Sequence, residues 1–166
     1  FMLKVLVGYP SPTEEFVIVE RMTGALQAVQ KVLTTDQLMA LQKEVDAVYI
    51  DPALIEYAVK VVIATRQPQN VGLKELQPYL TFGASPRASI NLILTARALA
   101  YVRGRMYALP QDVLDMAHDV IRHRLVLSYE ALSDNVSADA LLDKVLGRIA
   151  LPEVPLHEHS GIRARA

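Results

Sequence analysis

Apolar residues recur along most of the chain at the spacing of an amphipathic helix. The clearest stripe follows Asp51 and Pro52, which suit a helix N-cap and a first helical position. Its members fall at i, i+1, i+4, i+5, i+8 and i+9: Leu54, Ile55, Ala58, Val59, Val62 and Ile63. Glu56 and Lys60 form an i,i+4 pair on the other face. The pattern predicts a helix with one broad buried face.

Caps and prolines at first helical positions predict five further helices. These begin at Ser11-Pro12, Thr34, Ser85-Pro86, Pro110 and Ser137. Ser11 with Glu14, and Thr34 with Gln37, have the spacing of a capping box. The helix over residues 87–103 is apolar nearly all round, so we expect it to be the central and most buried one.

Only residues 3–9 favour a β-strand, and Gly8 and Pro10 end that segment. A single strand cannot satisfy its own backbone groups, so it needs a sheet that the rest of the sequence does not supply. Residues 67–84 are predicted to be a connecting loop with one helical turn near residue 75. We therefore expect a mainly α fold, in which a strand–helix stub precedes a helical bundle.

Composition narrows the class of protein. The chain has 166 residues, of which 52% are hydrophobic, with a net charge of −1 and no cysteine. The charge disfavours nucleic-acid binding, and the lack of cysteine excludes disulfides and thiolate metal sites. The apolar run over residues 58–64 is interrupted by Lys60 and is too short to span a membrane. We expect a cytoplasmic protein, and because its first residue is Phe1, a part of a longer one.

No familiar catalytic motif is present. The sequence has neither a GxxxxGK[ST] phosphate loop nor a GxGxxG fingerprint nor HExxH. His118 and His123 are five residues apart and fall on different faces of a helix, and His157 and His159 belong to a C-terminal tripeptide. We expect ordinary surface histidines and no metal site.

Arg87 is the residue whose position conflicts with helix electrostatics. It is a cation in the first turn of a helix, where the macrodipole disfavours positive charge by about 0.3–1 kcal/mol. A phosphate group would resolve the conflict, since free backbone N–H groups and a guanidinium both bind anions. A carboxylate partner or contact with solvent would also resolve it. The other basic clusters, Arg103-Gly104-Arg105 and Arg122-His123-Arg124, are interpreted as helix C-terminal caps, the second alternatively as a subunit contact.

The segment around Arg87 resembles a known family. The strings that carry the resemblance are Gly83-Ala84-Ser85-Pro86-Arg87-Ala88-Ser89, Tyr107-x-x-Pro110-x-Asp112-Val113 and His123-Arg124-Leu125, together with Gly8-Tyr9-Pro10-Ser11 near the start. They are similar to the C-terminal part of a MoxR-family AAA+ ATPase, and the similarity runs over residues 1–149.

The resemblance implies a division of the chain and a role for its parts. Residues 1–33 correspond to the last strand and helix of the nucleotide-binding core plus a linker, residues 34–150 to the helical lid, and residues 151–166 to a tail. Arg87 matches the sensor-2 arginine that reaches the γ-phosphate of ATP, with Ser85 and Pro86 beside it. The remaining catalytic groups, including the ligands of Mg²⁺, would lie upstream of Phe1, so the chain alone should be inactive.

The resemblance also implies partners. Family members form rings, commonly hexamers, act as chaperone-like ATPases and often work with von Willebrand A-domain proteins. Leu109 departs from the pattern, since a Ser or Thr usually caps the helix that begins at Pro110. The alternative is a stand-alone helical interaction module without nucleotide chemistry, which a start codon just before Phe1 with no open reading frame beyond it would favour.

Overall fold

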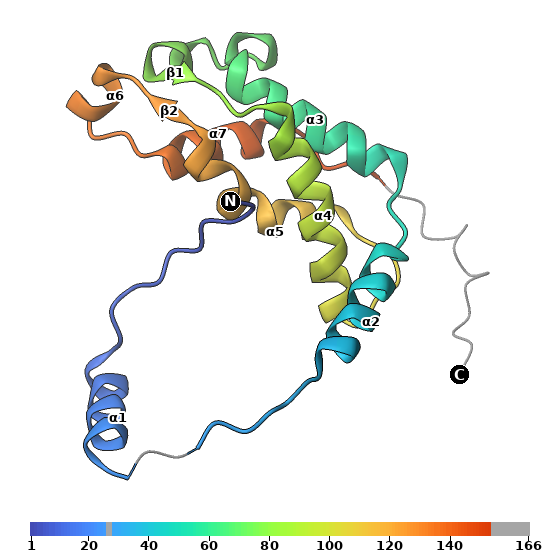
Figure 1. The fold of residues 1–166 in the computed structure, drawn as a ribbon. Coiled ribbons are helices and arrows are strands. Elements are labelled where there is room, and N and C mark those ends of the chain that lie inside the picture. The colour runs from blue at the N-terminus through green and yellow to red at the C-terminus, as the bar shows by residue number, and fades with distance from the viewer. Residues whose placement is uncertain (26–27, 154–166) are drawn as a thin grey trace.

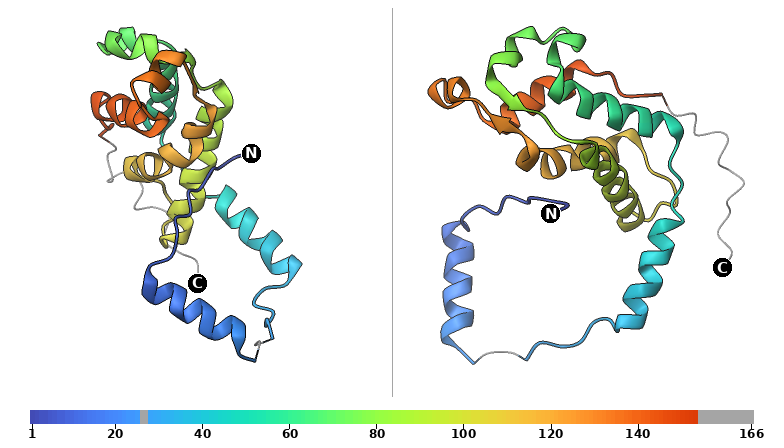
Figure 2. Two further views of the ribbon diagram at one scale, coloured as in Figure 1. Left: turned by 90° about the vertical axis from the view of Figure 1, so that its left-hand side faces the viewer. Right: turned by 45° about the horizontal axis from the view of Figure 1, so that its top comes forward.

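The computed structural model describes residues 1–25 and 28–153 as an N-terminal arm and a helical body (Figure 1). The arm carries α1 (Pro12–Thr23) and returns to the body at α2 (Thr35–Asp46). The body contains α3 (Pro52–Arg66), α4 (Pro86–Val102), α5 (Pro110–Ile121) and α7 (Ala138–Arg148). The short α6 (Tyr129–Ser133) lies at one end of it. Two further views show that α1 stands apart from the body (Figure 2).

The capping residues begin the helices as predicted. Ser11 and Glu14 form a reciprocal capping box on α1, and Thr34 and Gln37 do so on α2. The side chain of Asp51 accepts the N–H of Ala53 at 2.8 Å at the start of α3. Each cap satisfies a backbone donor that the first helical turn leaves without an intrahelical partner.

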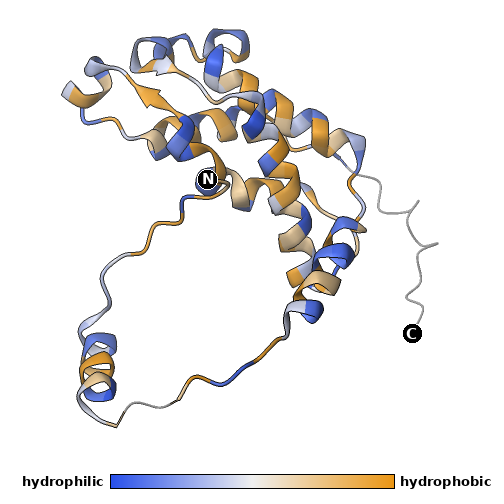
Figure 3. Cartoon of the chain, viewed as in Figure 1, coloured by the Kyte–Doolittle hydropathy of each residue, from blue (hydrophilic) through white to orange (hydrophobic). Residues whose placement is uncertain are grey.

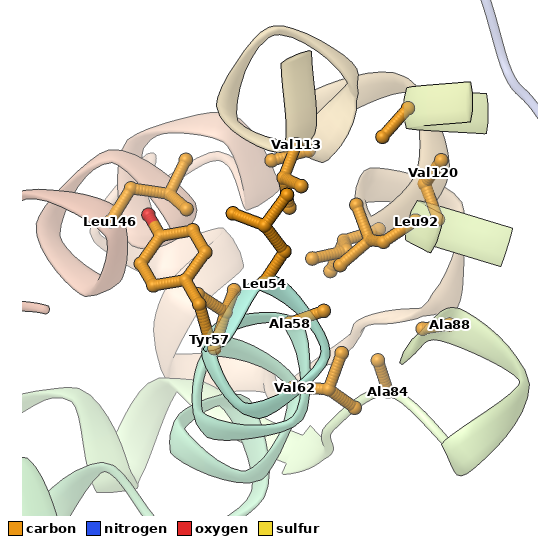
Figure 4. Close-up of a cluster of buried hydrophobic side chains, with 14 of the residues drawn as sticks. Leu54, Tyr57, Ala58, Val62, Ala84, Ala88, Leu92, Val113, Val120 and Leu146 are labelled. Carbon is orange, nitrogen blue, oxygen red and sulfur yellow. The ribbon is translucent and has the colours of Figure 1, made fainter. Parts of the chain in front are cut away.

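The core of the body lies where α3, α4, α5 and α7 meet (Figure 4). α3 contributes the largest number of buried side chains, and those of α4 are mostly small. Buried residues of these helices include Leu54, Tyr57, Val61, Val62, Ala88, Leu92, Ala96, Ala100, Val113, Val120, Ile121, Leu142 and Val145. Ala88, Ala96 and Ala100 share the buried face of α4 with Leu92, and their small side chains allow neighbouring helices to approach closely.

The expectation that α4 is the most buried helix is wrong. Ile90, Leu94 and Val102 lie on its other face and are 58%, 37% and 80% exposed. With Ile55 and Val59 of α3, the first two line an apolar cleft of about 460 Å³. A nearly uniform apolar pattern indicates two apolar faces, and the described residues cover only one of them.

The strand prediction also needs correction. Residues 3–9 are extended but form no strand, because no strand of the described residues lies beside them. The antiparallel pair of the structure is β1 (Leu80–Phe82) with β2 (Val126–Leu127). β1 follows two 3₁₀ turns, η1 (Pro68–Val71) and η2 (Lys74–Tyr79), in the segment predicted to be a loop.

Several apolar side chains of α1 are exposed. Phe16, Val19 and Met22 of α1 are 69%, 54% and 66% exposed, and α1 buries no residue. Coloured by hydropathy, α1 and the segments on either side of it show apolar stretches outside the body (Figure 3). The tail predicted over residues 151–166 lies outside the described residues from residue 154 onward.

Candidate functional site

The start of α4 is fixed by the end of α3. The N–H of Ala84 donates to Oγ1 of Thr65 at 2.9 Å, and that hydroxyl donates to the carbonyl of Val62 at 2.7 Å. Gly83 lies so close to the same turn that a Cβ there would stand 2.3 Å from the carbonyl oxygen of Thr65. Only glycine fits this approach, so the Gly-Ala pair determines where α4 begins.

The first turn of α4 has no side-chain cap, although the N–H of Ala88 already donates to the carbonyl of Ser85 at 2.8 Å. Ser85 is the N-cap, with extended backbone, but its side chain makes no capping hydrogen bond. Pro86 at the first position has no N–H to satisfy. Ser85 and Pro86 therefore leave this end of a 17-residue helix open to an external acceptor.

Arg87 extends from this turn into solvent. Its guanidinium makes no ion pair or hydrogen bond with any residue that the structure describes. Arg87 and Arg124 lie on a cleft of about 380 Å³ whose other lining residues are Phe1, Met2, Ile90 and Asn91. Two cations and no carboxylate line this cleft, so its electrostatics suit an anion.

Arg124 reaches the cleft because α5 runs back toward the start of α4. Its Nε donates to the carbonyl of Val120 at 2.7 Å, which caps the end of α5 as the sequence suggested. Its Nη2 donates to the carbonyl of Phe1 at 2.7 Å. The sequence did not place Arg124 beside Arg87, since the two are 37 positions apart and meet only through the packing of α4 on α5.

The basic cluster after α4 forms an ion-pair network around one buried carboxylate. Arg103 is the C-cap residue of α4, and the side chains of Arg103 and Arg105 also bind Asp112 of α5, whose side chain is fully buried. Arg103 also binds Asp115 at 2.6 Å. Burial raises the pKa of the Asp112 carboxyl, but hydrogen bonds from Arg105, the Leu109 N–H and Arg103 outweigh burial and leave its pKa lowered. The network joins the end of α4 to the start of α5.

The two histidines that the structure describes have different surroundings. His118 lies 2.8 Å from Asp143, nitrogen to oxygen, and the ring nitrogens of His123 have no hydrogen-bond partner. The described residues hold no group of three side chains able to bind a metal ion. His157 and His159 lie outside the described residues.

Comparison with known proteins identifies the class of domain. The AAA lid domain family matches residues 74–145, which include the start of α4, both arginines of the cleft and the ion-pair network. The chain belongs to the MoxR family of AAA+ ATPases, as the resemblance of its Gly-Ala-Ser-Pro-Arg segment implied.

Two of the curated relatives carry the MoxR name. Chaperone MoxR1 of Mycobacterium tuberculosis is 45% identical over 163 residues, which cover 96% of this chain and 43% of that protein. Protein MoxR of Paracoccus denitrificans is 34% identical over 110 residues, covering 63% of this chain and 32% of that one. The chain thus spans less than half the length of the curated relatives it matches.

A solved structure has the same fold. The crystal structure of a candidate ATPase from Cytophaga hutchinsonii superposes with a TM-score of 0.88 at 31% identity, over 92% of this chain and 47% of that one. The mainly helical fold is therefore confirmed. Within residues 1–25 and 28–153, no helix combines the length and apolarity that crossing a membrane requires.

Proposed function

We propose that this chain supplies the lid of a chaperone-like AAA+ ATPase and that Arg87 acts there as the sensor-2 arginine. The observation that carries the proposal is the unpaired guanidinium of Arg87 at the open N-terminus of α4, on a cleft with a second arginine. Residues 34–150 would form the lid and residues 1–33 the end of the core with its linker.

The residues present fit the triphosphate of ATP. Arg87 offers a planar fork of donors, the start of α4 at Ser85 and Pro86 presents the positive end of the helix dipole, and no carboxylate of the described residues lines the cleft. ATP with Mg²⁺ would supply the reactive phosphoanhydride bond, and the ligands of Mg²⁺ would come from the upstream core.

Arg87 would contribute by electrostatics and by position. A guanidinium beside the γ-phosphate stabilises negative charge that develops there during transfer. Because Arg87 is fixed on α4 through Gly83 and Thr65, movement of the helix carries the charge with it. Lid closure and charge stabilisation would therefore be coupled.

The test uses the longer protein in which this chain is joined to its nucleotide-binding core. We expect Arg87→Ala to lower ATP turnover at least about tenfold, because an added arginine contributes strongly to phosphoryl transfer. Lys144→Ala is the matched control, since it removes an exposed cation from α7. Unchanged turnover together with unchanged nucleotide affinity in Arg87→Ala would contradict the assigned role.

Two further measurements test the activity of the chain alone and the assembly of the longer protein. The chain alone should hydrolyse ATP no faster than buffer, because the phosphate loop is absent from its sequence. The longer protein should form a homo-oligomeric ring, commonly a hexamer in this family, in the cytoplasm, with a von Willebrand A-domain protein as its partner. Mass measurement in solution with and without ATP tests the ring, and a monomer under both conditions would contradict it.

A further inference from the structure

Residues 1–4 lie along the end of α5 and are held there through their main chain. The N–H of Lys4 donates to the carbonyl of Asp119 at 2.8 Å, and Nη1 of Arg122 donates to the carbonyl of Lys4 at 2.8 Å. The side chain of Leu3 packs against the core of the body. This short segment is therefore bound to the body although it belongs to the arm.

Arg124 holds the same segment at its first two residues, which line the cleft. Its Nη2 donates to the carbonyl of Phe1 at 2.7 Å and to that of Met2 at 3.5 Å. Phe1 and Met2 line the cleft together with Arg87. Arg124 therefore lines the cleft and also holds Phe1 and Met2, the two residues that the arm contributes to it.

Arg122 and Arg124 are themselves held in place. Arg122 is 13% exposed and binds both Asp119 and Asp139, while Nε of Arg124 binds the last turn of α5. Residues 122–124 form the 3₁₀ turn η3 directly after α5. Both guanidinium groups therefore meet the arm in fixed orientations, which lowers the entropy lost on binding it.

The second connection between arm and body is different. Residues 28–33 lead from the arm to α2 and, in the part of the chain that the structure describes, make no hydrogen bond to the body. Of the two places where arm and body meet, the one held by hydrogen bonds is therefore the one beside Arg87.

We propose that Arg122 and Arg124 are positioning residues that hold residues 1–4 against the body. Through this contact they would set the orientation of the lid, and with it Arg87, relative to the upstream nucleotide-binding core of the proposed function. We call this contact the clasp. The inference rests on the proposed function for its consequence, but the clasp itself is a property of this chain. A lid that moves must either turn about the clasp or release it, since the other connection imposes no such constraint.

The first experiment measures the clasp without nucleotide. Amide hydrogen exchange at Lys4, followed by NMR in this chain, reports whether the N–H remains bound to Asp119. We expect Arg124→Ala and Arg122→Ala each to accelerate exchange about tenfold or more, because charge-assisted hydrogen bonds hold the segment. Arg148→Ala is the matched control, because Arg148 likewise donates to a main-chain carbonyl, that of Val71 at 2.8 Å, and does not contact the arm. If Arg122→Ala unfolds the body, Arg122→Lys replaces it, since lysine retains the charge that faces Asp119 and Asp139.

The second experiment measures the consequence in the longer ATPase. A positioning role predicts that Arg124→Ala lowers turnover several-fold while Arg148→Ala does not, and that Arg87→Ala with Arg124→Ala is no slower than Arg87→Ala alone. Non-additivity follows because Arg124 would act through the placement of Arg87.

The outcomes separate the two proposals. Unchanged Lys4 exchange in both clasp variants overturns the clasp, and additive losses of turnover overturn its positioning role. If Lys4 exchange rises as expected but Arg87→Ala retains full turnover and affinity, the clasp stands as a contact and both the sensor-2 role and the positioning of Arg87 fall.

Discussion

The carboxylate of Asp112 accepts hydrogen bonds from both terminal nitrogens of Arg105. Nη1 donates to Oδ2 at 2.8 Å, and Nη2 donates to Oδ1 at 2.6 Å. Arg103 adds a third bond to Oδ1 at 2.8 Å, and the N–H of Leu109 adds a fourth to Oδ2 at 2.7 Å. A fully buried carboxylate thereby meets two cations from the loop after α4 and the backbone at the start of α5. The pairing fixes the turn between the two helices that carry the cleft.

Asp112→Asn should lower the free energy of unfolding by about 1–3 kcal/mol, because a buried side chain loses its charge-assisted hydrogen bonds to Arg105 and Arg103, which are 20% and 41% exposed. Chemical denaturation at pH 7 measures the change. Asp115→Asn is the control, since Asp115 is 30% exposed and binds Arg103 through one oxygen. Equal losses in the two variants would show that burial of Asp112 does not govern the energetics of the network.

The same carboxylate predicts an acid-dependent loss of stability. Its pKa in the folded chain lies below the usual 3.8, as hydrogen bonds to the charged form outweigh the opposing effect of burial. A group whose pKa is lowered by folding stabilises the fold above its unfolded pKa, and that stabilisation is lost as the pH falls through the folded pKa. The free energy of unfolding should therefore drop below about pH 4, and the drop should be smaller in Asp112→Asn. Denaturant titrations between pH 5 and pH 2 measure both slopes, and parallel curves would contradict the assignment.

Local signals in the sequence predicted the helices because capping is local. The caps at Ser11, Thr34, Asp51 and Ser137 each use a side chain and a backbone N–H two or three residues apart. The pairing of β1 with β2 joins Leu80 to Leu127, far apart in sequence, and no periodicity in two such short segments predicts it. Residues 3–9 show the converse: their residues favour a β-strand, but they form none because no neighbouring strand pairs with them.

In the candidate site, too, the local sequence predicted some features, and others depend on how the helices pack. Arg87 was identifiable because its charge conflicts with the helix dipole within a single turn. Among the described residues Arg87 has no carboxylate partner, and Arg124 lines the same cleft because of how α5 packs on α4. That Arg103 and Arg105 also pair with Asp112 likewise depends on how α5 packs against the end of α4, which the sequence could not show.

Gly83→Ala should destabilise the chain by about 1–3 kcal/mol, because the new Cβ would stand 2.3 Å from the carbonyl oxygen of Thr65 and the backbone would have to move. Thermal unfolding followed by circular dichroism measures the effect. Gly147→Ala is the matched substitution, since a Cβ there meets nothing within 4 Å and Gly147 lies inside α7. That variant should gain about 0.5–1 kcal/mol. The close approach of Gly83 to α3 would be contradicted if both variants were stabilised.

Leu109→Ser should strengthen the start of α5. Leu109 is the N-cap residue but has no side-chain acceptor, so the existing cap is only the bond from its own N–H to Asp112. A serine hydroxyl can accept the N–H of Asp112, which now bonds to the carbonyl of Leu109 at 3.0 Å. We expect a gain of up to about 1 kcal/mol in the free energy of unfolding, reduced by the lost packing of a partly buried leucine.

Leu109→Ala separates the two contributions, because it loses the packing without adding a cap. Denaturation of both variants against the original chain gives the comparison, and a serine variant no more stable than the alanine variant would show that the Asp112 bond alone already satisfies this helix end.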